Sequence, residues 1–250
     1  APDGASIVPY APSFPMPLLP ARLELNAEGV PWSEAYGDVY HSASGAAAQT
    51  EHVFLAGNGL PGRWQAARDF VIVETGFGLG LNFLHTWQRW RETRPVAGRL
   101  HFFSVEKHPF SREDLARAHD NAGVPPELAQ ALQARWPKLS PGLHRLEFGV
   151  DNMTLSLGFG EAVELLPCLK ARADAVFLDG FSPAQNPDMW SAGIFEALAA
   201  LSHAGTTLAT WSVAGRVRAG LREAGFAVDK VPGFGSKRQM LTGHFRPRTT

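Results

Sequence analysis

The residues with the clearest chemical potential form a glycine-rich segment at residues 74–80, with the sequence Glu-Thr-Gly-Phe-Gly-Leu-Gly. The segment follows a short β-branched run and precedes a stretch with helical periodicity that begins at Leu81. Glycines permit a tight turn and let the backbone approach a ligand without a Cβ clash. A helix start offers free N–H groups and a partial positive charge, which suit a carboxylate or a phosphate. We therefore expect Gly76, Gly78 and Gly80 to cradle a ligand.

Two acidic residues are placed where they can reach the same ligand. Glu106 ends a predicted strand, and a carboxylate there can accept hydrogen bonds from two ribose hydroxyls. Asp179 follows another predicted strand and opens a Gly-Phe-Ser-Pro turn. Ligands of doubly wound sheets lie beyond the carboxyl ends of the strands, so Asp179 is expected to face the same crevice as the glycine loop. Each acid also has a plainer interpretation: Glu106 as a surface partner of Lys107, and Asp179 as a helix N-cap.

The spacing of the glycines separates two classes of nucleotide site. A dinucleotide site prefers G-x-G-x-x-G, whereas this chain has G-x-G-x-G after an acidic residue at the strand end. That variant resembles the first motif of class I methyltransferases, in which the loop cradles the amino-acid end of S-adenosylmethionine. The alternatives are an oxidoreductase with a nucleotide cofactor, which the spacing disfavours, and a glycine turn that holds no ligand.

Alternating strands and helices are expected to position these residues. Apolar runs predict the strands, and apolar residues three and four apart predict the helices. The predicted strands cover residues 70–74, 101–106, 145–149, 175–178, 207–211, 227–231 and 239–244, and the predicted helices cover 81–90, 111–136 (interrupted at the Pro125-Pro126 pair), 191–201 and 214–224. This alternation is typical of a mostly parallel sheet covered on both faces. The expected fold class is α/β: a Rossmann-like class I S-adenosylmethionine-dependent methyltransferase with a small N-terminal β-rich lobe.

The chain before the first of these strands divides into two predicted parts. Residues 1–20 contain six prolines and no Lys or Arg, which does not fit a secretory signal, and residues 1–22 are expected to form a proline-rich tail. Residues 23–65 carry short apolar pieces broken by Gly and Asn, which predict a small lobe of hairpins and turns. Residues 66–250 are then expected to form the methyltransferase domain.

The composition argues against several classes of protein. No apolar run approaches the ~18 residues of a membrane span. Cys168 is the single cysteine, so no internal disulfide can form and a reducing compartment, the cytoplasm, is expected. The nine histidines include no H-x-x-x-H pair, so no metal site is expected. The net charge is −1, yet residues 211–250 carry eight basic and two acidic residues, which indicates either a surface for an anionic partner or a solvated rim.

Longer motifs resemble the methyltransferase domain of the MnmC family and its stand-alone relative MnmD. The resemblance runs from about Pro31 to His244 and rests on residues 38–40, 53–58, 74–83, 179–190 and 233–241. It implies S-adenosylmethionine as the cofactor and Asp179 as the residue that holds the acceptor amine, either as a base that takes its proton or only as an acceptor that orients it. The residues implied on the cofactor side are Glu74, Gly76, Phe77, Gly78, Gly80, Asn82, Glu106, Lys107, Asp151, Asn152, Met153 and Asp179. Those implied on the substrate side are Asp38, Tyr40, Phe181, Lys237 and Arg238.

One element of this pattern departs from the family. Class I members usually place an adenine-contacting acid in the order Phe-Gly-Asp after the third strand, whereas this chain reads Phe148-Gly149-Val150-Asp151. Asp151 is therefore displaced by one residue, with Asn152 and Met153 expected to flank the adenine.

The resemblance implies methyl transfer to the exocyclic amine of 5-aminomethyl-2-thiouridine at the tRNA wobble position, giving the 5-methylaminomethyl form. It also implies the tRNA anticodon stem-loop as partner and, in MnmC, an FAD-dependent oxidase domain that makes the amine. The alternative from another class is a tRNA-binding module whose methyltransferase fold has no activity.

Overall fold

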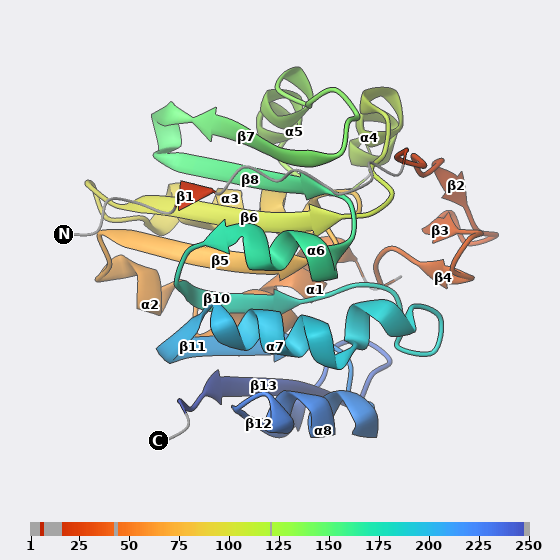
Figure 1. Ribbon diagram of the computed structural model, residues 1–250. Helices are drawn as coiled ribbons and strands as arrows, with labels where there is room; N and C mark the ends of the chain where they lie inside the picture. The colour runs from red at the N-terminus through yellow and green to blue at the C-terminus, as the bar shows by residue number, and fades with distance from the viewer. Residues whose placement is uncertain (1–5, 8–16, 43–44, 121, 248–250) are drawn as a thin grey trace.

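The computed structural model describes residues 6–7, 17–42, 45–120 and 122–247. Its centre is an eight-stranded sheet in the order β12-β13-β11-β10-β5-β6-β8-β7 (Figure 1). The strands with parallel neighbours are β5 (Asp69–Thr75), β6 (Arg99–Glu106), β8 (Met153–Phe159), β10 (Ala173–Leu178) and β11 (Ser202–Thr210). The antiparallel edges are β7 (Gly142–Phe148), β12 (Phe226–Pro232) and β13 (Gln239–Phe245). The predicted α/β class and mostly parallel sheet are confirmed.

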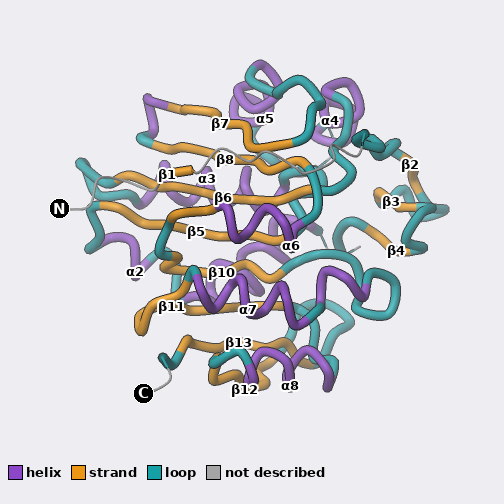
Figure 2. Tube along the Cα trace, viewed as in Figure 1, coloured by secondary structure: helices purple, strands orange, loops and turns teal. Residues whose placement is uncertain are grey.

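Helices cover both faces of this sheet because each central strand is apolar on both sides. Phe70 and Ile72 of β5 pack into one core, whereas Val71 and Val73 pack into the other. The face towards the viewer in Figure 1 is covered by α6 (Ala162–Leu165), α7 (Ala192–Ala200) and α8 (Gly215–Glu223). The core on the other face takes in side chains of α3 (Leu81–Thr93), α4 (Arg112–His119) and α5 (Pro126–Ala134). Figure 2 shows the alternation of strand and helix along the chain.

The N-terminal lobe is β-rich only in its first half. The strands β2 (Glu24–Leu25), β3 (Pro31–Ser33) and β4 (Asp38–Val39) form a small antiparallel sheet at the right of Figure 1, beside the carboxyl ends of the parallel strands. The predicted proline-rich tail, residues 1–22, lies mostly outside the described residues. Within it, Ser6–Ile7 forms β1, which pairs with β9 (Leu169–Lys170).

The prediction of hairpins and turns is wrong for residues 46–65. This segment consists of α1 (Ala46–Gln49), a π-helix at Thr50–Leu55, a 3-10 turn at Ala56–Asn58 and α2 (Gly62–Gln65). Its large apolar side chains, Val53, Phe54 and Trp64, are fully buried in the main core. The Gly and Asn residues that indicated hairpins instead end short helical turns, with Gly59 in the left-handed region at φ 68°.

The third parallel strand is β8, which the sequence analysis missed. The predicted strand at residues 145–149 belongs to β7, which is antiparallel to β8 at the edge of the sheet. Leu155, Leu157 and Phe159 of β8 are fully buried. Because β8 and not β7 runs parallel to β6, the residues that reach the carboxyl edge here are those after Phe159.

Candidate cofactor and acceptor site

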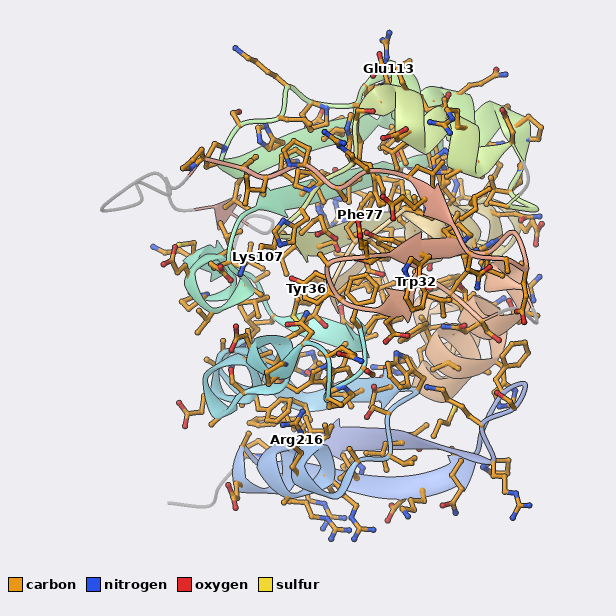
Figure 3. All side chains as sticks on the ribbon, turned by 90° about the vertical axis from the view of Figure 1, so that its right-hand side faces the viewer. Trp32, Tyr36, Phe77, Lys107, Glu113 and Arg216 are labelled. Carbon is orange, nitrogen blue, oxygen red and sulfur yellow. The ribbon has the colours of Figure 1, made fainter. Side chains whose placement is uncertain are left out.

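A cleft of about 700 Å³ opens at the carboxyl edge of the parallel strands. Figure 3 looks onto this edge, with Phe77, Lys107 and Tyr36 near its centre and Arg216 lower on the same side. The volume lies within the ~300–1,000 Å³ usual for small-molecule sites. The cleft is lined by the glycine loop, the start of α3, the segments that follow β6, β8, β10 and β11, the β12–β13 loop and the N-terminal hairpin.

The glycine loop forms a cradle that side chains would fill. Gly76 and Gly78 line the cleft with φ of 76° and 53°, a region that favours glycine. A Cβ on Gly76 would lie 3.2 Å from Gly180 Cα, and one on Gly78 would lie 3.3 Å from the ring of Tyr40. The backbone here therefore runs close to two other walls of the cleft, with no room for larger residues.

Glu106 sits at the end of β6 and holds the glycine loop in place. Its Oε2 accepts a hydrogen bond from the Gly78 N–H at 2.7 Å, and its Oε1 accepts one from the His108 N–H at 2.7 Å. Each carboxylate oxygen has a second lone pair, so Glu106 can still accept from a ribose. Lys107 beside it pairs with Glu161, with 2.6 Å between Nζ and Oε1.

Asp179 lies directly after β10 and carries the densest set of hydrogen bonds in the cleft. Its Oδ2 accepts from Asn82 Nδ2 at 2.8 Å, and its Oδ1 accepts from Trp211 Nε1 at 3.0 Å and from the Gly180 N–H at 2.8 Å. Burial raises the pKa of the Asp179 carboxyl to about 6, although these hydrogen bonds and Lys237 act to lower it. The group is therefore mainly ionised at neutral pH and can take up a proton just below it.

The N-terminal hairpin supplies an aromatic wall opposite Asp179. Phe181 stacks on Tyr36, with ring centroids 4.6 Å apart, and meets Tyr40 edge-on at 5.0 Å. Asp38 Oδ2 accepts a hydrogen bond from the Ser182 N–H at 2.8 Å and so ties the hairpin to the loop after β10. Burial raises the pKa of the Tyr40 hydroxyl, which keeps that side chain neutral.

Lys237 brings a positive charge to the same end of the cleft. Its Nζ lies 3.2 Å from the centroid of the Trp211 ring, a cation–π contact. Burial lowers the pKa of Lys237, while Asp38 and Asp179 raise it. Trp211 thus contacts Asp179 through its N–H and Lys237 through its ring face.

Comparisons with known proteins bear directly on this cleft. A family model described as S-adenosyl-L-methionine-dependent methyltransferase matches residues 125–246. The chain is 58% identical over 233 residues to the "tRNA 5-methylaminomethyl-2-thiouridine biosynthesis bifunctional protein MnmC" of Azoarcus sp. (strain BH72), and 56% identical over 235 residues to that of Cupriavidus necator. These alignments cover 93% and 94% of this chain. The chain belongs to the MnmC methyltransferase family.

The matched relatives are longer proteins. The chain spans 37% of the Azoarcus protein and 36% of the Cupriavidus protein. A solved structure of MnmC2 from Aquifex aeolicus superposes with a TM-score of 0.73 at 22% identity, covering 91% of this chain and 71% of that one. At that identity the superposition supports the fold alone. The predicted family, Rossmann-like fold and S-adenosylmethionine cofactor are confirmed.

The cleft fits the cofactor of the MnmC methyltransferase family. Gly76 and Gly78 line the cleft with bare backbone, which lets a ligand approach the loop closely. Glu106 at the end of the second parallel strand offers acceptors for ribose hydroxyls. Of the residues predicted on the cofactor side, those that line the cleft are Gly76, Phe77, Gly78, Asn82, Glu106, Lys107 and Asp179.

Asp151, Asn152 and Met153 do not lie at the cleft, which contradicts their predicted contact with adenine. Asp151 and Asn152 precede β8 and Met153 is its first residue, so all three lie at the amino edge of the parallel strands. The Asp151 carboxylate accepts hydrogen bonds from Trp87 Nε1 at 2.7 Å and from Arg91, and is 5% exposed. The prediction was wrong because β7, an antiparallel edge strand, was taken for the third strand.

Three other predicted residues stand apart from the cleft surface. Glu74 is 1% exposed and lies behind the loop, where it binds Asn82 and Ser104. Gly80 does not line the cleft, and a Cβ there would lie 2.7 Å from the Phe77 ring, so Gly80 makes room for that ring. Arg238 is exposed beside Lys237 but does not line the cleft. All five predicted substrate residues except Arg238 line it.

Sequence reasoning missed Trp211 and Glu161, which both line the cleft. Trp211 follows β11 and Glu161 follows β8, so the rule that ligands lie beyond the carboxyl ends of strands applies to both. That rule could have identified Trp211 as a cleft residue, since Trp211 ends the predicted strand 207–211. Glu161 was not, because β8 was not predicted.

In residues 6–7, 17–42, 45–120 and 122–247, no helix is long and apolar enough to cross a membrane. Within the same ranges, no three His, Cys, Asp or Glu side chains are grouped so that they can hold a metal ion.

Proposed function

We propose that this chain transfers a methyl group from S-adenosylmethionine to the exocyclic amine of 5-aminomethyl-2-thiouridine at the tRNA wobble position. The product is the 5-methylaminomethyl nucleoside that appears in the names of the relatives. The observation that carries the proposal is the position of Asp179. Its carboxylate shares one cleft with the glycine loop and is held by Asn82 and Trp211.

Methyl transfer requires that the amine nitrogen is aligned with the methyl carbon and that the amine is uncharged. Bound S-adenosylmethionine supplies an activated methyl group on a sulfonium, so the reaction requires no covalent enzyme intermediate. The residues of the cleft have to bring the amine nitrogen within ~3 Å of the methyl carbon. Asp179 can accept a hydrogen bond from the amine and so fix where its lone pair points. It can also take the proton that the nitrogen loses after transfer.

A carboxylate alone works against this reaction because it favours the charged ammonium form of the amine. Lys237 offsets that effect. Its ammonium group sits on the Trp211 ring, and Trp211 is itself bonded to Asp179, so a positive charge stands beside the acceptor site. A nearby like charge disfavours protonation of the substrate amine. Asp179 and Lys237 together keep the site near neutrality, which suits binding of the reactive amine.

The aromatic wall suits a nucleobase. Phe181 and Tyr36 stack on one another, and Tyr40 closes the edge of this group. A wobble base turned out of the anticodon stack needs apolar or aromatic surfaces to replace the stacking that it loses. We expect the thiouridine ring to lie against these side chains, with its aminomethyl arm directed to Asp179.

The proposal extends to the partners of the chain. The relatives are bifunctional and nearly three times as long, which supports a further domain or protein that supplies the amine; we expect an FAD-dependent oxidase in that role. We expect the chain to act in the cytoplasm, where tRNA is modified.

The test is nucleoside analysis by mass spectrometry. tRNA that carries 5-aminomethyl-2-thiouridine is incubated with the purified chain and S-adenosylmethionine, and the digested nucleosides are compared with those from a sample without enzyme. We expect the wobble nucleoside to gain one methyl group. If it is unchanged although the protein binds both tRNA and cofactor, the chain is a binding module and the proposal is wrong.

A further inference from the structure

A buried carboxyl group lies directly behind the acceptor site and does not touch the cleft. Glu74 lies in β5, opposite Ser104 of β6 and Phe177 of β10 in the strand register, and is 1% exposed. Its Oε1 accepts a hydrogen bond from Asn82 Nδ2 at 3.0 Å, and its Oε2 lies 2.6 Å from Ser104 Oγ. Removing an ionised carboxylate from water this completely is costly unless strong partners compensate.

Asn82 connects this buried acid to Asp179. Its Nδ2 donates to Glu74 Oε1 and also to Asp179 Oδ2, at 3.0 and 2.8 Å. Its Oδ1 accepts from Thr50 Oγ1 at 2.7 Å, which uses the other end of the amide. An amide nitrogen has two hydrogens, so both are in use. The two carboxyl groups therefore share one donor, and a change at Glu74 reaches Asp179 through Asn82.

The two acids are not equivalent. Burial raises the pKa of Glu74 well above its ordinary value, and the charges of Asp179 and Glu106 raise it further, while the hydrogen bonds from Ser104 and Asn82 lower it. Two acids bound to one group resist a second ionisation, as in other paired carboxyl sites. Asp179 has three donors and faces solvent in the cleft, so the negative charge of the pair resides there.

We propose that Glu74 is a positioning residue that stays uncharged and, through Asn82, holds Asp179 as the charged member of the pair facing the methyl acceptor. An uncharged Glu74 accepts from Asn82 through its carbonyl oxygen. The hydrogen bond that Ser104 Oγ donates to an ionised Glu74 is then reversed, with the Glu74 hydroxyl donating to Ser104 Oγ. The second hydrogen of Asn82 remains on Asp179. The inference deepens the proposed function and rests on it. Glu74, the first residue of the glycine-rich segment, then makes no direct contact with the cofactor. It fixes the orientation of the acceptor site instead.

The other charged and titratable groups around the pair come from three elements. Glu106 ends β6, Asp38 lies in the hairpin, and Lys237 lies in the β12–β13 loop. Tyr40 is neutral because its pKa is raised. None of these side chains changes in the variants below, so they form a constant background for the comparison.

The first test compares Glu74→Gln with Glu74→Ala. A glutamine keeps an acceptor for Asn82 and a donor for Ser104 without any charge. We expect kcat of Glu74→Gln to stay within about twofold of wild type, with the acid limb of its pH profile unmoved, because an uncharged group is replaced by another. Glu74→Ala removes the acceptor of Asn82 and should lower kcat roughly tenfold, the value of one hydrogen bond, with KM and cofactor Kd little changed.

The second test asks whether the effect passes through Asn82. The loss caused by Glu74→Ala should disappear when it is made in an Asn82→Ala background, since the two residues then act as one unit. Fully additive losses would mean that Glu74 only supports the fold. The proposal would be overturned if Glu74→Gln lost as much kcat as Glu74→Ala. It would also be overturned if the acid limb of the Glu74→Gln pH profile moved to lower pH. Either result would show that Glu74 is charged.

A third measurement does not depend on activity. In protein labelled with ¹³C at glutamate carboxyls, the Glu74 resonance is identified by its absence from Glu74→Gln and followed with pH. A protonated carboxyl at pH 7 supports the proposal, and an ionised one overturns it even if Glu74→Ala fails to fold. Absence of methyl transfer by the wild type would instead contradict the proposed function, while this titration would still decide the state of Glu74.

Discussion

Asp179 combines two properties that usually exclude one another. In the proposed reaction it is the carboxylate that faces the methyl acceptor, and it needs a negative charge to take a proton. It also lies in a site whose burial favours the uncharged form and raises its pKa to about 6. Hydrogen bonds from Asn82, Trp211 and the Gly180 N–H offset part of that burial. The result is a carboxyl group whose proton affinity is close to the operating pH, which is the range in which proton transfer is most efficient.

The first prediction concerns this group. Single-turnover methylation by the wild type should fall as the pH drops through about 6, since the raised pKa of Asp179 means that its charged form is lost there and retained above. Asp179→Asn should lower the rate on the order of a hundredfold, the scale of a positioned proton acceptor, and should remove that limb. Asp229→Asn, on edge strand β12, is the control. A folded Asp179→Asn variant as fast as wild type would exclude the role.

The second prediction concerns the glycine cradle. Gly78→Val introduces a branched side chain where a Cβ already lies 3.3 Å from Tyr40 and where φ is 53°, so the loop has to move or the cleft has to narrow. We expect the affinity for S-adenosylmethionine, measured by calorimetry, to fall at least roughly tenfold, or ~1.4 kcal/mol. Gly149→Val is the matched control, because no atom lies within 4 Å of its Cβ position. Equal affinities for both variants would show that the cofactor does not bind at this loop.

At the scale of elements, the parallel strands all supply residues to the cleft at the same end. β5, β6, β8, β10 and β11 each deliver cleft-lining residues from their carboxyl ends, because parallel strands end at the same edge. The antiparallel edge strand β7 brings its carboxyl end to the opposite edge, and Asp151 follows it there. The direction of a strand therefore decides whether an acid beside it serves the site or the core.

The third prediction tests this distinction. Asp151 holds Trp87 Nε1 and Arg91 at the amino edge, and its side chain is 7% exposed. Asp151→Ala leaves a buried indole N–H and a guanidinium without this acceptor. We expect the free energy of unfolding, from urea denaturation, to fall by about 1–3 kcal/mol. The cofactor affinity of the folded variant should match wild type. A large loss of affinity without a loss of stability would show that Asp151 belongs to the cofactor site.

What the sequence could predict follows from the same reasoning. The strong periodicity of β5 and α3 and the acid at the end of β6 fix the loop and the cofactor because these signals are local. β8 was missed because its Thr, Ser and Gly interrupt the apolar run, although tertiary packing buries nearly all of it. The role proposed for Glu74 also lay beyond sequence reasoning, because it depends on the contact between Asn82 and Asp179, which are 97 positions apart in the chain. Such contacts depend on the assembled sheet.

At the scale of the whole molecule, positive and negative charges are concentrated in different parts of the chain. Residues 211–250 carry eight basic and two acidic residues on a chain whose net charge is −1, so the remainder is acidic. The structure places α8, β12 and β13 together at one end of the sheet (Figure 1). Arg216, in the first turn of α8, lies on the side of the molecule that carries the cleft (Figure 3), and Lys237 lines the cleft itself. Arg248 lies outside the described residues.

The last prediction is that tRNA docks against this basic end. Phosphate contacts can set the register of the anticodon stem-loop without reading sequence, so that the wobble base reaches the cleft. Lys237 lines the cleft and Arg238 is exposed beside it. Reversing both to Glu should weaken tRNA binding and reduce the slope of log K against log salt by about one per lost phosphate contact. Filter-binding salt titrations with tRNA that carries the unmethylated amine measure both quantities.

The control is a reversal of equal charge at the opposite edge. Arg68 precedes β5 and Arg94 precedes β6, so both lie where the parallel strands begin, away from the cleft. Long-range attraction between exposed charges is screened within ~8–10 Å at physiological salt, so the Arg68→Glu, Arg94→Glu variant should bind tRNA almost as wild type does. Cofactor affinity should be little changed in either variant. If the two double variants lose affinity equally, only the net charge of the molecule matters; if neither loses any, tRNA docks elsewhere, and the basic end is solvated surface.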